Sequence, residues 1–192
     1  LIRLEEQGLV ELIAQRGTMI SNVDLEKVKQ EHFVRVAIEE KVTELFMALH
    51  TPSDLQKMNS NLMAQEALIT NNTIDVRKLI RLDNEFHEHI YKVAQQEFSL
   101  KVVENASGNY QRVRLLIVEY LGNAHQIVKE HGAILAAFQA RDYKTMNVLF
   151  DKHLGRLERQ AQQLQKSAPH LFKGKNDNKT NVWHTDYLAT LK

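Results

Sequence analysis

Residues that break helices are rare in this chain. Its 192 residues include only 7 glycines and 2 prolines. A β-sandwich or barrel needs a turn about every ten residues and builds those turns largely from glycine and proline. From Asp24 onward the apolar residues recur instead at the spacing of amphipathic helices. The sequence therefore predicts an all-α fold, and with 43% hydrophobic residues the chain can bury a core.

Six helices are expected in the main part of the chain. Periodicity and breaks place them at residues 31–50, 53–69, 75–95, 98–120, 124–140 and 143–166. The first is expected to turn Val34, Ala37, Ile38, Val42, Leu45 and Leu49 toward the core, and Ser53 to cap the second. Short connections between helices favour an antiparallel bundle.

The first 23 residues have a different pattern. A helix end stops at Gly8, and two strand-like runs follow, joined by a turn in which Gly17 can take a positive φ. This segment is too small to fold alone, so we interpret residues 1–23 as the remnant of a domain that begins before Leu1. We expect residues 24–30 to be a linker, 31–173 the helical domain and 174–192 a polar tail. From Ser167 onward, the chain is expected to be loose or docked only by Val182, Trp183 and Tyr187.

Polar residues occupy the centres of three predicted apolar stripes. Asp83 and His87 share one face of the third helix at i, i+4, and His131 and His153 hold the same place on the fifth and sixth. Burying a carboxylate and three imidazoles is unfavourable unless each is paired or bound to a cation. A divalent Zn, Ni, Mn, Fe or Co ion would satisfy all four, and the absence of cysteine disfavours thiophilic ions.

Other interpretations of these residues remain open. A histidine on an apolar stripe can simply be hydrogen-bonded in the core, and a structural helical dimer with core histidines would bind no metal. Arg35, at the edge of the first stripe, can seat an anionic ligand or pair with Glu39, and Arg114 is a weaker candidate for the same role. The remaining histidines are expected at the surface or its boundary: His32, His50, His89, His125, His170 and His184.

Charge and composition restrict the partners only weakly. The formal net charge is +1, which by itself argues for neither nucleic acid nor membrane. There are no cysteines, which fits a cytoplasmic protein, and no apolar run approaches the ~20 residues of a membrane span.

Two parts of the chain match a known family. Leu1–Val10 and Gln15–Thr18 resemble the end of the recognition helix and the wing of GntR-type winged-helix regulators. The helical part resembles the FCD effector domain of the FadR subfamily. The matching residues are Phe33–Glu39, Asp83–His87, Glu130–Leu135 and His153-Leu154. Six bundle helices rather than seven are similar to the VanR-like branch, in a chain that lacks most of the winged helix-turn-helix.

The resemblance implies a transcription regulator that binds operator DNA as a homodimer. It implies that Asp83, His87, His131 and His153 bind the metal, and that a small carboxylic or sugar acid binds beside it with Arg35 and Arg114. Contacts to DNA would come from the helix end and the wing: Arg3, Gln15, Arg16, Gly17 and Thr18.

The alternative is a metal-dependent enzyme acting on a small organic acid. An enzyme needs a general acid or base beside the metal, and the predicted stripes show no further inward carboxylate. The wing-like segment at the amino terminus favours a regulator over both the enzyme and the structural dimer. The metal, the effector, the operator and the sign of the regulation are not determined by the sequence.

Overall fold

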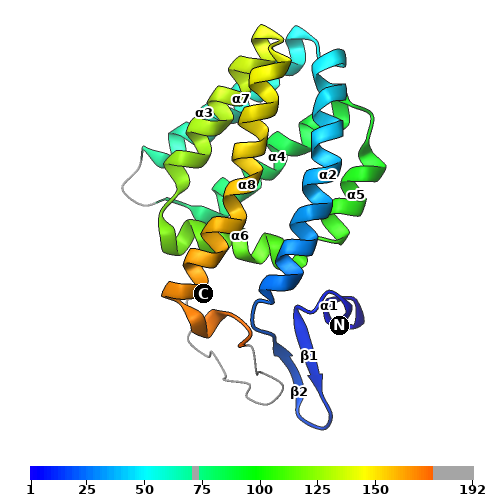
Figure 1. The fold of residues 1–192 in the computed structure, drawn as a ribbon, viewed down its shortest axis with the longest axis vertical. Coiled ribbons are helices and arrows are strands. Elements are labelled where there is room, and N and C mark those ends of the chain that lie inside the picture. Colours follow the sequence, from blue (N-terminus) through cyan, green and yellow to red (C-terminus); the bar gives the residue numbers. More distant parts are fainter. Residues whose placement is uncertain (71–73, 175–192) are drawn as a thin grey trace.

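The structure is a computed structural model that describes residues 1–70 and 74–174 (Figure 1). Within them it has eight α-helices, a two-stranded hairpin and a 3-10 turn. The elements are α1 (Ile2–Glu6), β1 (Val10–Ile13), β2 (Gly17–Ile20), α2 (Leu25–Leu49), α3 (Pro52–Ile69), α4 (Val76–Val93), α5 (Glu97–Asn105), α6 (Gly108–Leu121), α7 (Ala124–Ala140), α8 (Tyr143–Ser167) and η1 (Pro169–Leu171). The prediction of an all-α bundle preceded by a small hairpin is confirmed.

The bundle is built around two long helices. α2 and α8 each have 25 residues and pack against one another. In Figure 1, α4 lies behind this pair, α7 and α3 lie beside α8, and α6 crosses one end. The larger core cluster includes the fully buried aromatic side chains Phe46, Phe86 and Phe138. A smaller cluster joins α6 to the final turns of α8. The site described below lies where α4, α7 and α8 face each other.

The buried face of α2 differs from the predicted stripe. Ala37 and Leu49 are exposed. Three charged residues at four-residue spacing, Glu31, Arg35 and Glu39, are buried in their place. Val42 is buried, and Ile38 and Leu45 pack against the core as predicted, so apolar periodicity located only part of the inner face, which these charges complete.

Two helix starts also differ from expectation. Residues 24–30, predicted to be a linker, form the cap and first turns of α2, since the Asp24 carboxylate accepts from the N–H groups of Glu26 and Lys27. Thr51, not Ser53, caps α3 in a capping box with Asp54, and Pro52 is the first helical residue.

The helix expected at 98–120 is divided into α5 and α6. The Ser107 hydroxyl donates to the Val103 carbonyl, and Gly108 allows the Leu9 side chain to lie 3.0 Å from the place where a Cβ would stand. Leu9 comes from the hairpin segment, so tertiary packing rather than local pattern places this break. Seven helices, α2–α8, therefore form the bundle in the described part of the chain. The count of six, which suggested the VanR-like branch, is wrong.

The chain after α8 docks on the start of the molecule. Phe172 is 2% exposed, its strand-like backbone bridges Val23, and the Lys173 N–H donates to the Val23 carbonyl at 2.9 Å. Residues 168–173 are thus anchored, contrary to the prediction that only more distant residues would dock. Those residues, Val182, Trp183 and Tyr187, lie outside the described part of the chain, as does most of the predicted polar tail.

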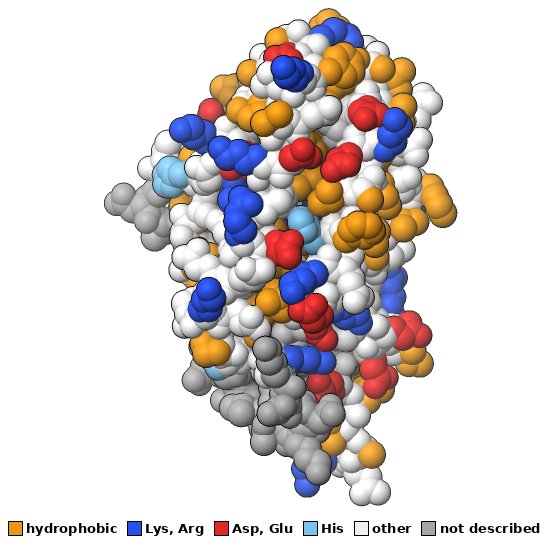
Figure 2. All heavy atoms as spheres, in the orientation of Figure 1, with side chains coloured by type: hydrophobic (Ala, Val, Ile, Leu, Met, Phe, Trp, Pro, Cys, Tyr) orange, Lys and Arg blue, Asp and Glu red, His pale blue; other side chains and the backbone are white. Residues whose placement is uncertain are grey.

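The hairpin extends from the end of the bundle (Figure 1). β1 and β2 pair antiparallel with Val10 opposite Ile20, and Gln15 and Gly17 take positive φ angles of 61° and 102°. On the face shown in Figure 2, cationic and anionic side chains are interspersed. None of the helices within residues 1–70 and 74–174 is long and apolar enough to span a bilayer.

Candidate metal centre

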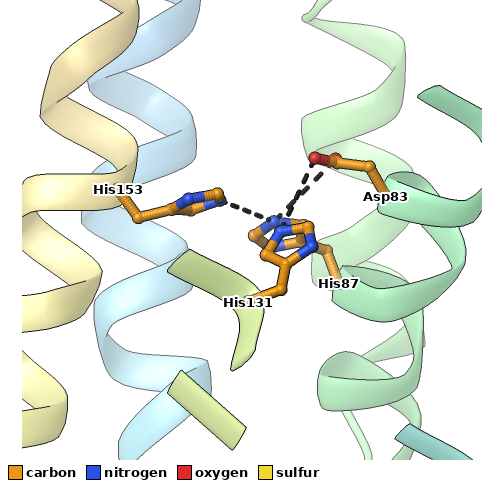
Figure 3. A group of neighbouring side chains, drawn as sticks. All are labelled: Asp83, His87, His131 and His153. Atoms are coloured by element: carbon orange, nitrogen blue, oxygen red, sulfur yellow. Dashed lines mark hydrogen bonds and ion pairs between the residues drawn. The ribbon is translucent and has the colours of Figure 1, made fainter. Parts of the chain in front are cut away.

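The four predicted ligands come together in the middle of the bundle (Figure 3). α4 supplies Asp83 and His87, α7 supplies His131 and α8 supplies His153, and all four side chains are buried. One ligand atom from each lies within 4.8 Å of the others. The geometry thus brings together every residue that the sequence pointed to as a ligand.

A chain of amides fixes the orientation of His131. The Asn61 amide donates to the Leu82 carbonyl at 3.0 Å, and the Gln65 amide donates to Asn61 Oδ1 at 2.7 Å. Gln65 Oε1 is then left as an acceptor, 2.8 Å from His131 Nδ1. His131 Nδ1 must therefore carry the proton, and its Nε2 presents a lone pair.

Carboxylates orient the other two rings in the same way. Glu130 Oε2 lies 2.9 Å from His153 Nδ1, and Glu39 Oε2 lies 3.3 Å from His87 Nδ1. Burial opposes ionisation of Glu130, but hydrogen bonds from His153 and Gln126 outweigh it and lower the pKa to about 2. Burial likewise opposes ionisation of Glu39, but Arg35 and then His87 lower its pKa to about 2. Both carboxylates are ionised, so His153 Nδ1 donates to Glu130, and the negative charge of Glu39 favours a proton on the nearby His87 Nδ1 although the two atoms form no hydrogen bond. With this protonation each Nε2 faces the centre as a lone-pair donor.

The resulting donor set fits a divalent cation. The Nε2 atoms of His87 and His153 are 3.3 Å apart, and when both rings carry their proton on Nδ1 these two nitrogens face each other in the core with their lone pairs. His131 Nε2 is buried without a hydrogen-bond partner among the described residues. Burial lowers the pKa values of His131 and His153, and this favours the neutral, ligating form. A shared cation would resolve both the facing lone pairs and the unpaired nitrogen.

The fourth candidate ligand, Asp83, is already held by an arginine. Arg114 pairs with Asp83 Oδ2 and donates to Asn84 and Gln111 at 2.7 Å each. Asp83 Oδ1 faces His131 Nε2 at 3.6 Å. Burial opposes ionisation of Asp83, but Arg114 and then His131 hold its pKa well below the usual range. Asp83 is therefore an anionic oxygen donor.

Arg35 forms the pair with Glu39 that was one of the two interpretations left open by the sequence, and it is buried rather than exposed. Arg35 is 4% exposed, and its Nε donates to Glu39 Oε1 at 2.9 Å, so the arginine reaches inward and also pairs with Glu39. Its guanidinium carbon lies 4.9 Å from the centroid of the Tyr110 ring, and that of Arg114 lies 5.7 Å from the same centroid. Both arginines are fixed close to the candidate ligands.

A cavity of about 40 Å³ adjoins three of the four candidate ligands. Its lining includes Asp83, His87, His153, Arg35, Arg114, Tyr110, Asn123, Arg156 and Gln160. This volume is enough for a few water-sized groups, and the lining combines arginines with amides. A small anion that carries hydroxyl groups matches that chemistry.

The comparisons with known proteins agree with this fold. The model of the FCD domain matches residues 32–156, well over half of the chain. The chain belongs to the FCD-domain family. The matched range contains all four candidate ligands and both arginines.

Relatives of this FCD protein are named as regulators. The HTH-type transcriptional repressor RspR of Escherichia coli K12 is 25% identical over 171 residues, which are 89% of this chain and 74% of RspR. A regulator from Streptomyces ambofaciens is 24% identical over 172 residues, 90% of this chain and 71% of the relative. The solved structure of E. coli McbR/YncC has a TM-score of 0.70 at 16% identity, covers 84% of this chain and 81% of its own, and shows the shared fold. The FCD protein is thus a transcription regulator and not an enzyme. The solved structure of a GntR-family member from Pseudomonas syringae pv. tomato shares its fold, with a TM-score of 0.60 at 17% identity over 88% of this chain and 69% of its own.

Two further carboxylates lie on the inner faces of the helices, contrary to the prediction from the sequence. Glu39 and Glu130 are buried carboxylates within reach of the candidate ligands, although no further inward carboxylate was expected. They contact the outer nitrogens of His87 and His153 and leave the inner ones free. The assignment as a regulator therefore rests on the FCD family and its relatives.

Sequence reasoning also missed Gln65 and misplaced two histidines. Gln65 is 0% exposed, although glutamine side chains usually lie at the surface. Its burial depends on the packing of other helices around it, so the sequence carries no signal for it. His32 and His50 are buried rather than superficial, and His32 Nε2 contacts the Leu154 carbonyl at 3.0 Å. His89 is half-buried and His125 and His170 are exposed, whereas His184 lies outside the described residues.

The predicted DNA-contacting residues fall into two groups. Gln15, Arg16, Gly17 and Thr18 are exposed at the hairpin tip, free of the bundle. Arg3 is also exposed, but it donates to Asn105 Oδ1 at the end of α5. In this conformation Arg3 contacts the FCD domain itself.

Proposed function

We propose that this FCD regulator binds a divalent cation through Asp83, His87, His131 and His153. The observation that carries the proposal is the convergence of three imidazole Nε2 atoms whose outer nitrogens each face an acceptor. Nitrogen and oxygen donors suit Zn²⁺, Ni²⁺, Mn²⁺, Fe²⁺ or Co²⁺. When bound, such a cation would supply a Lewis-acidic seat for an oxygen of an anionic ligand.

We further propose that the cavity beside these ligands holds the effector, a small carboxylic or sugar acid. Arg35 and Arg114 line the cavity, and their guanidinium groups offer directed hydrogen bonds to a carboxylate. Asn123 Oδ1 is buried without a hydrogen-bond partner among the described residues and can accept from a hydroxyl group. Charge and polarity thus favour a hydroxylated anion over an apolar ligand.

The proposed output is a change in operator binding by a cytoplasmic homodimer. The exposed tip, with Arg16 flanked by Gln15, Gly17 and Thr18, would contact the DNA backbone as the wing of a winged helix, and Arg3 would lie at the end of its recognition helix. Effector binding would shift the placement of the paired DNA-binding units only if two conformations of the bundle bind it differently.

Metal analysis and titration test the cation site. Elemental analysis of the purified chain, and titration of the metal-free chain with Zn²⁺ and Ni²⁺, should show one ion per chain. A His131→Ala/His153→Ala variant should lose it, whereas exposed His125→Ala should not. Equal binding by the double variant and the wild type would overturn the site.

The effector is tested separately. Thermal unfolding of the metal-loaded chain with a panel of hydroxy and sugar acids should reveal a stabilising acid. Arg35→Met should reduce that stabilisation. If no acid shifts the midpoint, or if Arg35→Met responds as the wild type does, the proposed effector site is wrong.

A further inference from the structure

We propose that cation binding at the metal centre changes how the hairpin segment docks on the bundle, and that α6 carries this coupling. Here the hairpin segment means residues 1–22, and the corner means residues 105–112, where α5 ends and α6 begins. The inference rests on the proposed cation site and adds a route from it to the part of the chain that would face DNA. α6 lies across the end of the bundle from which the hairpin extends (Figure 1).

The hairpin segment is fastened to the corner by specific hydrogen bonds. The Gln7 side-chain amide donates to the Asn105 carbonyl at 2.7 Å, and the Asn109 amide donates to the Gln7 carbonyl at 3.0 Å. Arg3 adds a bond to the Asn105 side chain, and Arg112 donates to the Ser21 carbonyl. The position of the hairpin segment therefore depends on the position of the corner.

The corner is in turn fastened to α2 by a buried carboxylate. Glu31 is 8% exposed, and it accepts from the Tyr110 N–H at 2.6 Å and from the Asn109 amide at 3.2 Å. The same Asn109 amide group thus joins the Gln7 carbonyl to Glu31. Displacing the hairpin segment would disturb the hydrogen bonds of Asn109 and Glu31. Because Glu31 is buried, it needs these hydrogen bonds to offset the loss of water around its carboxylate.

Two arms lead from the corner to the candidate ligands. Along α6, Arg114 lies one turn after Tyr110 and pairs with Asp83. Along α2, Glu31 is followed at four-residue intervals by Arg35 and Glu39, and Glu39 faces His87.

The Tyr110 ring connects the two arms, because both guanidinium groups lie within 6 Å of its centroid, at 4.9 and 5.7 Å. Tyr110, in the first turn of α6, is therefore connected to two of the four candidate ligands. On one arm Arg114 links it to Asp83. On the other arm Arg35 and Glu39 link it to His87.

The ion pair between Asp83 and Arg114 makes this connection sensitive to cation binding. Arg114 and a divalent cation would share one carboxylate, so the attraction that holds Arg114 in place would change when the cation binds. Arg114 is on α6, whose first turn carries the corner. By linkage, if cation binding alters the docking of the hairpin segment, loosening that segment must alter cation affinity by the same factor.

Hydrogen exchange and Zn²⁺ titration test the proposal in the full chain. Zn²⁺ should change amide exchange in residues 9–21 and 105–112 of the wild type. An Arg3→Ala/Gln7→Ala variant, altered only at exposed or half-buried side chains outside the bundle, should exchange faster in residues 9–21. Its dissociation constant for Zn²⁺ should differ from that of the wild type by roughly fivefold or more. Exposed Glu5→Ala, on the same short helix, is the matched control and should retain the wild-type constant.

The outcomes separate this inference from the proposed function. If the wild type binds no Zn²⁺, the cation site and the coupling both fail. If it binds Zn²⁺ but the exchange of residues 9–21 is unchanged, or the Arg3→Ala/Gln7→Ala variant has the wild-type constant, the coupling alone is overturned. An Arg3→Ala/Gln7→Ala variant that exchanges like the wild type also overturns it, since the docking contacts would then hold nothing in place.

Discussion

At the scale of single residues, the orientation of the three histidines depends on partners that lie outside the candidate ion site. His87 and His153 face carboxylates, whereas His131 faces the neutral amide of Gln65. Each partner selects the tautomer that leaves Nε2 free, and the carboxylates also increase the basicity of their rings. The geometry therefore assigns Gln65, Glu39 and Glu130 a positioning role.

Replacing Gln65 tests that role. A Gln65→Leu variant loses the acceptor for His131 Nδ1, so its affinity for Zn²⁺ should fall by roughly 10–100-fold. Isothermal titration of the metal-free chain measures it. Gln56→Leu, at an exposed position of the same helix, should bind like the wild type. Unchanged affinity in Gln65→Leu would show that the amide does not position the ring.

Glu31 gives a pH-dependent prediction. Burial raises its pKa above the ordinary value of 4.5, against the opposing hydrogen bonds from Tyr110 and Asn109. A carboxyl group with a raised pKa in the folded state stabilises most at acidic pH, and this contribution is lost as the pH rises through the folded value. The free energy of unfolding of wild type minus that of Glu31→Gln should therefore decrease from pH 4.5 to 7.5. Urea unfolding at several pH values measures it, and a difference that rises with pH would contradict the assignment.

At the scale of elements, helix ends are set by local chemistry where the pattern is strong. Asp24, Thr51, Asp75 and Asp142 accept from N–H groups in the first turns of α2, α3, α4 and α8. At its carboxyl end, α6 is closed by Gly122, which takes a left-handed φ of 62° and has open space where a β-carbon would stand. Only backbone strain opposes a side chain there.

Two glycine substitutions should have opposite effects. Gly122→Ala forces a β-carbon into the left-handed region and should destabilise the chain by about 1 kcal/mol. Gly155→Ala, inside α8 with open space where the new β-carbon would stand, should stabilise it by about 0.5–1 kcal/mol, because alanine favours the helix. Chemical denaturation measures both. A neutral or stabilising Gly122→Ala would mean that α6 can end without this cap.

At the scale of the whole molecule, the proposed ion ties together parts that lie far apart in the sequence. Its ligands span residues 83 to 153 and come from three helices. At the end of the bundle, Val23 and Phe172 join the start of α2 to the segment after α8. Ligands gathered from separate helices form a site only in the folded chain, so ion binding and folding should be linked.

Zn²⁺ should therefore stabilise the folded chain. At a free concentration of a hundred times its dissociation constant, the expected gain is about 2.7 kcal/mol in the free energy of unfolding. A chelator should reverse the gain, and His131→Ala/His153→Ala should show none. Thermal unfolding followed by circular dichroism measures it. An equal gain in the double variant would place the stabilising ion elsewhere.

The sequence by itself determined the fold class and the four candidate ligands. Helix breakers were rare, and polar residues at the centres of apolar stripes stood out because burying them needs compensation. Only tertiary structure decided the inner face of α2, the break between α5 and α6, and the roles of Gln65, Glu39 and Glu130. Those features depend on the rotation and contacts of neighbouring helices. A charged or amide side chain looks like a solvent-facing residue until packing surrounds it with partners that satisfy it.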